Sequence, residues 1–356
     1  MSDELPRRIL ILKPSAIGDV VHALPVLAVL RRAWPSARIA WLINDRLVPL
    51  LAGHPLLDEL IPFDRRCYGR FGRHVEASQR FVEFLAALRA RRFDVVLDLQ
   101  GLFRTGFLAR AAGATRRLGL ADATEGAWLF YTDRTAPAPG PAHVVERNLR
   151  IVELLRLEAC CDAPSAELLP VNPMVRQDVS RLLRQRGLPD GARYAVLAPG
   201  TLWQTKRWPV ERFARLGEML HDRLGLSVVL TGGPKEAHRV AELASRCARP
   251  TVEMVAGVGV AELVALLDGA ALTVAGDSGP IHIASTLGRP VVAIFGPSDP
   301  ARNGPVGQPD HVVRAEVPCL GCRRRKLRHC PYAHRCMQAL EPEAVFEVAQ
   351  RAVAND

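Results

Sequence analysis

Four loops in the sequence group side chains that could bind an anion or move a proton, and each follows an apolar run. The first loop, KPSAIGD at residues 13–19, contains Ser15, Gly18 and Asp19. Small residues at the start of a helix leave backbone N–H groups open to an anion, and the helix dipole favours the ionised form of Asp19. Such a carboxylate can act as a general base, although an aspartate in a first helical turn can equally serve as a plain cap.

The second loop, APGTLWQTKRWP at residues 198–209, has the composition of a phosphate site. Thr201, Thr205 and Lys206 offer two hydroxyls and a mobile ammonium beside Gly200. Lysine binds phosphate as a point charge, and hydroxyl groups can add hydrogen bonds. The two tryptophans of this loop are consistent with packing alone.

The third loop, GDSGPIHIAS at residues 276–285, is the most specific of the four. Ser278 and Gly279 stand at the start of an expected helix, with a proline in its first turn, where backbone N–H groups favour an anion. Asp277 and His282 can bind a ligand or orient the loop. A purely structural loop does not need these residue types so close together.

The fourth loop, TGGPKE at residues 231–236, ends on Glu236 after a Gly-Gly-Pro turn. A carboxylate at that place can accept hydrogen bonds from ribose hydroxyls or from an adenine amine. No G-x-G-x-x-G fingerprint follows an expected strand, and no P-loop is present. The pattern therefore argues against a dinucleotide oxidoreductase.

Short runs rich in Val, Ile and Leu alternate with helical stretches and predict two doubly wound α/β domains, residues 1–170 and 171–356. We place the linker near residues 165–175, in the sequence VNPM. Ligands of such sheets bind at the carboxyl ends of the strands, and a cleft between the two domains is the expected active site. The expected strands are 8–13, 37–43, 94–100, 194–200, 226–233, 272–277 and 290–297, and the expected helices are 20–33, 76–92, 143–157, 209–224, 234–247 and 342–353.

The charge balance points to an anionic partner. The 356 residues carry 47 Lys and Arg against 37 Asp and Glu, a net charge of +10, and only four of the bases are lysine. Between residues 60 and 120, twelve arginines face five acidic residues. That excess suits a nucleic acid, a phosphorylated glycolipid or a membrane surface, and it is also consistent with a merely soluble basic face.

The ends and hydropathy of the chain predict its location. No apolar run reaches the length of a bilayer span, and the first residues lack the order of a signal peptide. We therefore expect a cytoplasmic protein that is not an integral membrane protein.

Eight cysteines are spread unevenly, and four of them fall within eighteen residues near the carboxyl end. Their spacing, C-x2-C-x7-C-x5-C, could wrap one tetrahedral zinc or iron ion, and such a four-thiolate site would be structural. Free thiols or a disulfide remain the alternatives. The four residues are Cys319, Cys322, Cys330 and Cys336.

With these motifs in view, the chain resembles the bacterial lipopolysaccharide heptosyltransferases of glycosyltransferase family 9. The resemblance covers nearly the whole chain and implies the GT-B architecture, in which two doubly wound, Rossmann-like domains face each other across a cleft. The middle segments resemble the heptosyltransferase I branch, and the cysteine-rich end resembles the heptosyltransferase II branch. It rests on KPSAIGDVVHALP, DLQGLFRTGFLA (98–109), HVVERN (143–148), TKRWP (205–209) and GDSGPIHIASTLGRPVVAIFGPSDP (276–300).

The resemblance also implies roles for the residues of these motifs. Asp19 would be the base that deprotonates an acceptor hydroxyl, and Lys206 would stabilise the charge on departing ADP as a heptose transfers with inversion. No divalent metal is needed for this chemistry. The donor-binding residues would be Ser15, Gly18, Thr201, Glu236, Asp277, Ser278, Gly279 and His282, with Ser278 where the family usually has threonine, and the acceptor-binding residues would be Gln100 and Arg104.

The same resemblance implies how the domains and partners divide. Residues 1–170 would bind the acceptor, an anionic glycolipid of the lipid A–Kdo type or a heptose of the inner core. Residues 171–356 would bind the ADP-sugar and include the cysteine-rich segment 319–336 and a closing C-terminal helix. The basic face could hold the enzyme at the inner leaflet of the inner membrane.

Three alternatives stay open at this point. A related transferase could use another nucleotide sugar or an acceptor outside lipopolysaccharide, and a nucleotide-sugar 2-epimerase shares the two-domain architecture. A basic nucleic-acid binder with a zinc knuckle is disfavoured, because aromatic residues make up only 6% of the chain and are not interleaved with the bases.

Overall fold

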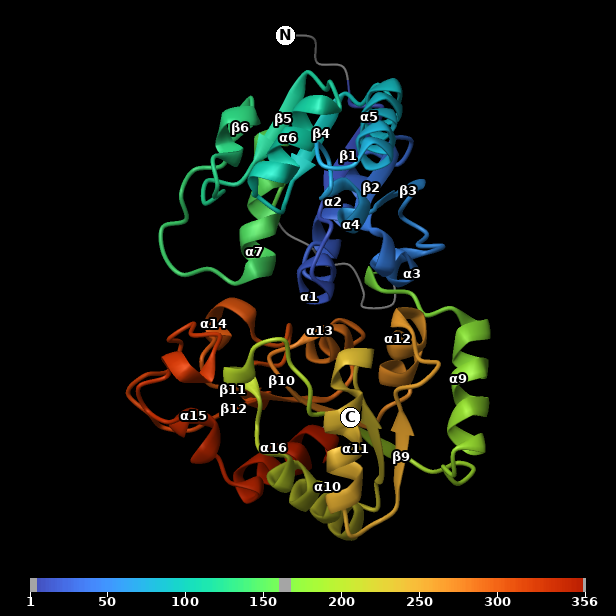
Figure 1. Cartoon of the computed structure of the whole chain (residues 1–356), viewed down its shortest axis with the longest axis vertical. Helices are drawn as coiled ribbons and strands as arrows, with labels where there is room; N and C mark the ends of the chain where they lie inside the picture. The colour runs from blue at the N-terminus through green and yellow to red at the C-terminus, as the bar shows by residue number, and fades with distance from the viewer. Residues whose placement is uncertain (1–4, 160–167, 355–356) are drawn as a thin grey trace. The chain divides into compact units, whose positions relative to one another are not determined.

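A computed structural model describes residues 5–159 and 168–354 and divides the chain into two compact units. Unit 1 spans Met1–Pro170 and unit 2 spans Val171–Asp356. In Figure 1, unit 1 runs from blue to green and unit 2 from yellow-green to red. No helix in the described ranges is long and apolar enough to cross a membrane.

The core of unit 1 is a parallel sheet with the strand order β3-β2-β1-β4-β5-β6. Its central strand is apolar along almost its whole length, as a strand covered on both faces must be. Among the described residues the six strands are β1 (Arg8–Leu12), β2 (Arg38–Asn44), β3 (Glu59–Phe63), β4 (Val95–Asp98), β5 (Arg116–Gly119) and β6 (Asp133–Arg134).

Helices α5 (Val75–Ala90) and α6 (Phe103–Ala111) cover one face of this sheet. Leu88 and Leu108 from these helices pack on Leu10, Leu12 and other strand residues. Helix α2 (Leu24–Ala33) contacts α7 (Val144–Leu149), and the other α-helices among the described residues of unit 1 are α1 (Ile17–Val21), α3 (Val48–Leu51) and α4 (Arg65–Tyr68).

Two expectations for unit 1 need correction. The single helix expected over 20–33 is two helices, because Pro25 fixes the first turn of α2 and starts a new helix there. The helix expected over 143–157 ends at Leu149 and continues as the 3₁₀ segment Arg150–Leu155. Strands β3, β5 and β6 were not expected; β5 and β6 are short and carry few apolar residues, whereas β3 is an apolar run that the sequence analysis missed.

Unit 2 contains a second parallel sheet with the order β12-β11-β10-β7-β8-β9. Numbered within each unit, both sheets have the order 3-2-1-4-5-6, which is typical of doubly wound nucleotide-binding folds. The direction of winding reverses between β1 and β4 in unit 1 and between β7 and β10 in unit 2. The strands are β7 (Tyr194–Ala198), β8 (Ser227–Thr231), β9 (Thr251–Met254), β10 (Leu272–Gly276), β11 (Val291–Phe295) and β12 (Val312–Arg314).

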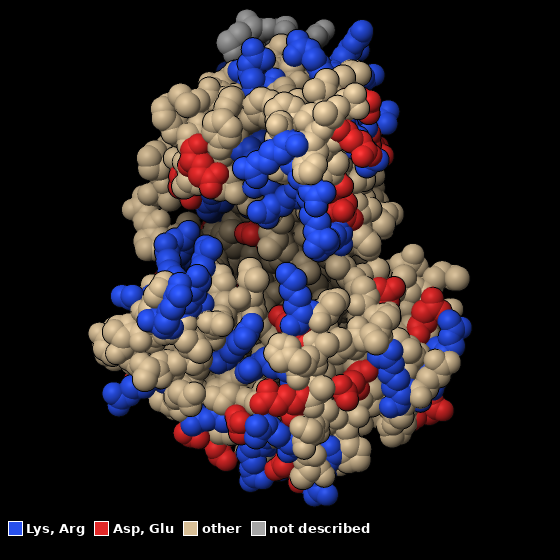
Figure 2. Space-filling view, in the orientation of Figure 1, with Lys and Arg blue, Asp and Glu red and all other residues tan. Residues whose placement is uncertain are grey.

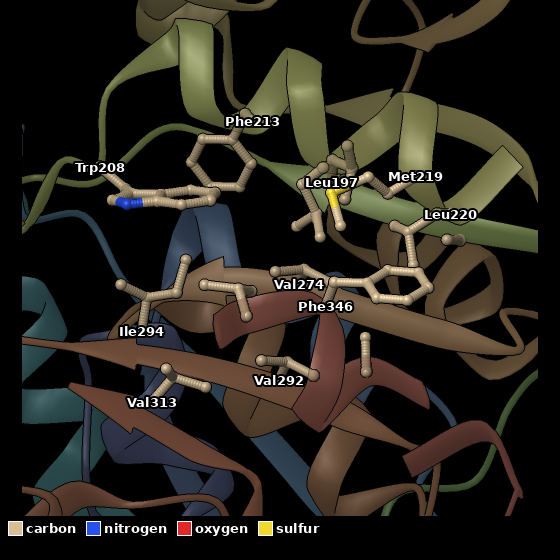
Figure 3. Close-up of a cluster of buried hydrophobic side chains, with 14 of the residues drawn as sticks. Leu197, Trp208, Phe213, Met219, Leu220, Val274, Val292, Ile294, Val313 and Phe346 are labelled. Carbon is tan, nitrogen blue, oxygen red and sulfur yellow. The ribbon is translucent and has the colours of Figure 1, made fainter. Parts of the chain in front are cut away.

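Helices α10 (Val210–Leu224), α11 (Ala237–Arg246) and α16 (Pro342–Ala354) pack with this sheet around one apolar core. Figure 3 shows part of that core, with Phe213 and Phe346 among side chains from the strands. Helix α9 (Pro173–Gln185) contacts α12 (Val260–Asp268), which contacts α13 (Gly279–Thr286). The short helices α14 (Pro300–Asn303) and α15 (Arg335–Gln338) complete the unit.

The expected linker VNPM is partly helical. Asn172 accepts a hydrogen bond from the Met174 N–H at 2.9 Å, and Pro173 occupies the first turn of α9. An asparagine cap followed by proline is a common helix start, so the last two residues of this sequence belong to unit 2 as helix.

Trp208 is a core residue of unit 2. Its ring packs edge-on against Phe213 with 4.9 Å between centroids, and its Nε1–H donates to the carbonyl of Leu340 at 3.0 Å. Trp208 is 1% exposed, whereas Trp203 in the same loop is only half-buried. Packing therefore accounts for one tryptophan and not for the other.

We expect Trp208→Ala to lower the free energy of unfolding by about 3–5 kcal/mol, because the substitution leaves a cavity in the core. Trp203→Ala, the matched control, should cost less than about 1 kcal/mol. Urea unfolding followed by circular dichroism measures both, and equal losses would contradict the distinction between the two rings.

Candidate functional site

The loops that follow β7 and β10 converge at the point where the winding of unit 2 reverses. A Cβ atom on Gly276 would lie 2.9 Å from the carbonyl oxygen of Lys206 and 3.1 Å from Cγ2 of Thr201. Only glycine fits such a close approach. The loop after β7 therefore packs directly on the end of β10, at the place where doubly wound sheets bind ligands.

The centre of this site is the buried carboxylate of Asp277, which accepts two hydrogen bonds. Lys206 Nζ donates to Oδ2 at 2.5 Å, and His282 Nε2 lies 3.1 Å from Oδ1. Burial alone would raise the pKa of Asp277, but the bonds and charges of His282 and Lys206 outweigh it and hold that pKa well below its usual range. The carboxylate is thus ionised and fixes both partners.

The ammonium of Lys206 has N–H donors left over for an anion. An ammonium has three N–H donors, and Asp277 takes one of them. The same Nζ lies 4.2 Å from the centre of the Trp203 ring, whose face attracts cations. Lys206 is therefore held by a carboxylate and an indole while donors remain for a ligand.

The N-terminus of helix α13 adds backbone donors to the same site. The Ser278 hydroxyl donates to the Gly276 carbonyl at 3.1 Å and does not cap the helix. The first N–H groups of α13, beginning at Gly279, are therefore not used by this side chain. They and the helix dipole favour an anion such as phosphate.

Glu236 lies at the same edge of the sheet, after β8. Its Oε2 accepts the Gly233 N–H at 2.9 Å, and a Cβ on Gly200 would fall 2.3 Å from the Glu236 carboxyl carbon. The close approach brings the carboxylate beside the loop after β7. The structure therefore places Thr201, Lys206, Glu236, Asp277, Ser278, Gly279 and His282 on the loops at one edge of the unit 2 sheet.

In unit 1 Asp19 lies in the first turn of α1, just after the loop that follows β1, and a buried lysine stands next to it. Asp19 Oδ2 accepts the Ala16 N–H at 2.8 Å, and its Oδ1 lies 3.9 Å from Nζ of Lys13. The Asp19 side chain is 44% exposed, so a ligand can reach it. Ser15 and Gly18 lie in the same loop and are half-buried.

Lys13 was not among the expected site residues. Its side chain is 3% exposed, and its Nζ donates to the carbonyl of Leu99, just after β4, at 2.8 Å. Burial lowers the pKa of Lys13, and the charge of Asp19 is the largest opposing influence. Two features of the sequence could have indicated Lys13 as a site residue. It is one of only four lysines, and it lies at the end of an expected strand.

The expected acceptor residues follow β4. The backbone N–H of Gln100 donates to the buried carboxylate of Asp98 at 2.9 Å, while Gln100 Oε1 is buried without a hydrogen-bond partner among the described residues. Partial burial lowers the pKa of Arg104, and the nearby cation of Arg65 lowers it further, although Glu125 opposes both. Two cations near one polar loop suit an anionic ligand.

Only part of the arginine excess between residues 60 and 120 is free for such a ligand. Arg91 pairs with Glu59 at 2.7 Å, Arg116 donates to the Leu154 carbonyl at 2.8 Å, and Arg117 donates to two backbone carbonyls. These side chains hold unit 1 together. Figure 2 shows many other basic side chains on the face of unit 1 turned to the viewer.

Comparison with known proteins identifies the family. A family model described as glycosyltransferase family 9 (heptosyltransferase) matches residues 81–333. The chain belongs to this family. Lipopolysaccharide heptosyltransferase 1 of Pseudomonas aeruginosa is 28% identical over 327 residues, which cover 91% of this chain and 88% of that protein.

Solved structures agree with this family 9 assignment. The glycosyl transferase family 9 protein of Veillonella parvula has a TM-score of 0.81 at 24% identity, with 98% of each chain covered. Escherichia coli heptosyltransferase WaaC with ADP-2-deoxy-2-fluoro heptose has a TM-score of 0.74 at 26% identity, with 97% of this chain and 99% of that chain covered. The chain is a glycosyltransferase with the GT-B fold, as the resemblance implied.

The structure does not support the four-cysteine metal site expected from the sequence. Within the described residues, no group of three or more His, Cys, Asp and Glu side chains could hold a metal ion. Cys336 is buried in the unit 2 core, whereas Cys322 is exposed and Cys319 and Cys330 are half-buried. A thiol packed among apolar side chains acts as a small hydrophobic group, which separates its role from that of the exposed thiol.

We expect Lys13→Met to separate activity from stability. The lowered pKa means that the folded state disfavours the charged amine, so methionine at neutral pH should leave the free energy of unfolding unchanged or higher. The transfer rate should fall at least about tenfold, because the cation beside Asp19 is lost.

Thermal unfolding and steady-state kinetics measure the two effects of Lys13→Met. Lys235→Met, which removes an exposed lysine, is the matched control and should change neither. A destabilised Lys13→Met variant with normal kinetics would show that Lys13 serves the fold alone.

Proposed function

We propose that this chain is an inverting heptosyltransferase that transfers a heptose from ADP-heptose to a Kdo or heptose residue of the lipopolysaccharide inner core. The observation that carries the proposal is the cluster of Lys206, Asp277 and His282 at the start of helix α13, which forms a site for a diphosphate. The similarity to WaaC, whose structure contains an ADP-heptose analogue, supports the choice of donor.

In this proposal unit 2 binds the donor. The diphosphate lies at the N-terminus of α13 and beside Lys206, where fixed donors and a cation meet its negative charge. Glu236 accepts hydrogen bonds from the nucleoside, and Thr201 lines the loop next to Gly276. The binding energy comes from groups already held in place, so little reorganisation is needed when the charge on ADP grows.

The proposed reaction is a single displacement. The acceptor hydroxyl oxygen attacks the anomeric carbon of the heptose while the bond from that carbon to the β-phosphate oxygen breaks. The electron pair of the broken bond leaves with ADP, next to Lys206 and α13. Asp19 takes the hydroxyl proton. Because the hydroxyl attacks from the side opposite the departing ADP in one displacement, the configuration at the anomeric carbon inverts.

Unit 1 binds the acceptor in this proposal. Gln100 Oε1 is buried and accepts no hydrogen bond from the described residues. The positive charges of Arg104 and Arg65 are close enough to interact. Guanidinium groups bind carboxylates and phosphates through paired hydrogen bonds. An anionic sugar acid or phosphorylated glycolipid therefore suits this side of the site.

We expect Asp19→Asn to reduce the transfer rate by about 10²–10⁴-fold, the usual worth of a general base. ADP affinity should change less than about twofold, because the proposed diphosphate contacts lie in unit 2. Asp45→Asn, which neutralises an exposed aspartate of the same unit, should leave both quantities unchanged.

Isothermal titration with ADP in the presence of chelator, and turnover of ADP-heptose on a Kdo-containing acceptor, measure these effects. Loss of ADP affinity that equals the loss of rate would contradict the role of Asp19. Binding of UDP in place of ADP would be consistent with a glycosyltransferase but would contradict ADP-heptose as the donor.

We also propose that the enzyme works in the cytoplasm at the inner face of the inner membrane, where a glycolipid acceptor is embedded. On unit 1, Phe71, Val75 and Val82 are 53%, 77% and 57% exposed, and Arg70 and Arg73 are exposed beside them. Apolar side chains flanked by arginines suit the interface of an anionic bilayer.

We expect the enzyme to sediment with vesicles that contain anionic phosphatidylglycerol and not with vesicles of phosphatidylcholine alone, and to do so less at high salt. The double variant Phe71→Ser/Val75→Ser should weaken binding about tenfold, since two apolar contacts are lost. Met174→Ser, which removes an equally exposed apolar residue from unit 2, is the control. Equal binding by all three proteins would reject this face as the membrane contact.

A further inference from the structure

The cysteine-rich segment 319–336 is attached to the loop that carries Lys206. Thr205, which precedes Lys206, donates its hydroxyl hydrogen to the carbonyl of Arg324, and its own carbonyl lies 2.7 Å from His334 Nε2. A carbonyl accepts, so Nε2 carries the hydrogen. Burial lowers the pKa of His334, which keeps the ring neutral in this role. The segment thus holds Thr205 by its side chain and by its backbone.

The other end of segment 319–336 is attached to the loop after β11. The Gly321 N–H donates to the Gly296 carbonyl at 2.9 Å, and the Arg323 N–H donates to the Pro297 carbonyl at 2.7 Å. A Cβ on Gly296 would lie 2.9 Å from Sγ of Cys336, so the chain packs closely there as well. These contacts hold the arginine-rich segment in place.

This attachment brings a second cation to the Trp203 ring. The guanidinium carbon of Arg325 lies 4.8 Å from the ring centre, and Lys206 Nζ lies 4.2 Å from the same ring. Lys206 is paired with Asp277, but Arg325 forms no ion pair with an acidic side chain in the part of the chain that the structure describes. The Arg325 side chain is exposed and is not needed to fill a core.

Two cations that share one indole repel each other, and an anion that contacts both relieves the repulsion. The ring restricts the guanidinium, so less side-chain freedom is lost when Arg325 binds a ligand. Its flat fork can donate two hydrogen bonds to one phosphate group, which complements the point charge of lysine.

We propose that Arg325 is a second cationic ligand for the diphosphate of the donor, supplied to the Lys206 loop by the segment 319–336. This inference rests on the proposed function, which assigns the diphosphate to that loop. As the bond from the anomeric carbon to the β-phosphate oxygen breaks, Arg325 shares with Lys206 the charge that accumulates on ADP. The segment also keeps Lys206 in position through Thr205.

The experiment compares Arg325→Gln with Arg328→Gln, which removes the same charge from an exposed arginine of the same segment. Arg328 contacts His329 and does not touch Trp203, so it controls for net charge. Isothermal titration with ADP and with adenosine, and steady-state kinetics with the donor, are run on both variants and on the unaltered enzyme. Arg325→Lys tests whether charge without the planar fork suffices.

Arg325→Gln should bind ADP about five- to tenfold more weakly, because one charge-assisted contact is lost at an exposed site. Its affinity for adenosine should stay within about twofold, since adenosine has no phosphate. Arg328→Gln should match the unaltered enzyme, and Arg325→Lys should recover part of the ADP affinity.

Equal ADP affinity of Arg325→Gln and the unaltered enzyme would overturn this inference and leave the proposed function standing. An equal loss in Arg328→Gln would also overturn it, because the effect would then be one of net charge. Failure of the unaltered enzyme to bind ADP would overturn the proposed function and this inference together.

Discussion

One buried ion pair organises the proposed donor site. Asp277, in the loop after β10, accepts from Lys206, in the loop after β7, and from His282, in helix α13, and its side chain is only 5% exposed. A buried carboxylate without partners would be costly, so the two loops stay together wherever the fold is intact. The loop after β7 packs so closely on Gly276 that even a Cβ atom would not fit between that loop and the end of β10. The position of the proposed diphosphate site at α13 follows from this constraint.

The two units repeat the same arrangement with a different degree of burial. Each has a lysine and an aspartate where the strand order reverses: Lys13 with Asp19 in unit 1, and Lys206 with Asp277 in unit 2. The carboxylate of Asp277 is buried and fully bonded, which suits a group that orients others. The carboxylate of Asp19 is 44% exposed and weakly paired, which suits a group that exchanges a proton. The difference in burial therefore suits two chemically similar pairs to different proposed roles.

Hydrogen bonds and core packing attach the segment 319–336 to unit 2. Its backbone donates to the loop after β11, its His334 binds Thr205, and Cys336 joins the apolar core. The spacing of four cysteines suggested coordination, yet spacing does not say which thiols point into a core and which point to solvent. In this protein the segment holds the loop that carries Lys206 and places the charge of Arg325 beside that loop.

The sequence by itself determined the α/β class, the central strands and the loops that carry Asp19, Lys206 and Asp277, because apolar runs and Gly-rich turns are local signals. It did not predict the short strands β3, β5, β6, β9 and β12, whose pairing depends on neighbours distant in the chain. Only the tertiary structure decided that Lys13 is buried beside Asp19 and that Trp203 faces Lys206 and Arg325. Those roles depend on burial and, for Arg325, on a contact between residues more than a hundred positions apart, which no local pattern encodes.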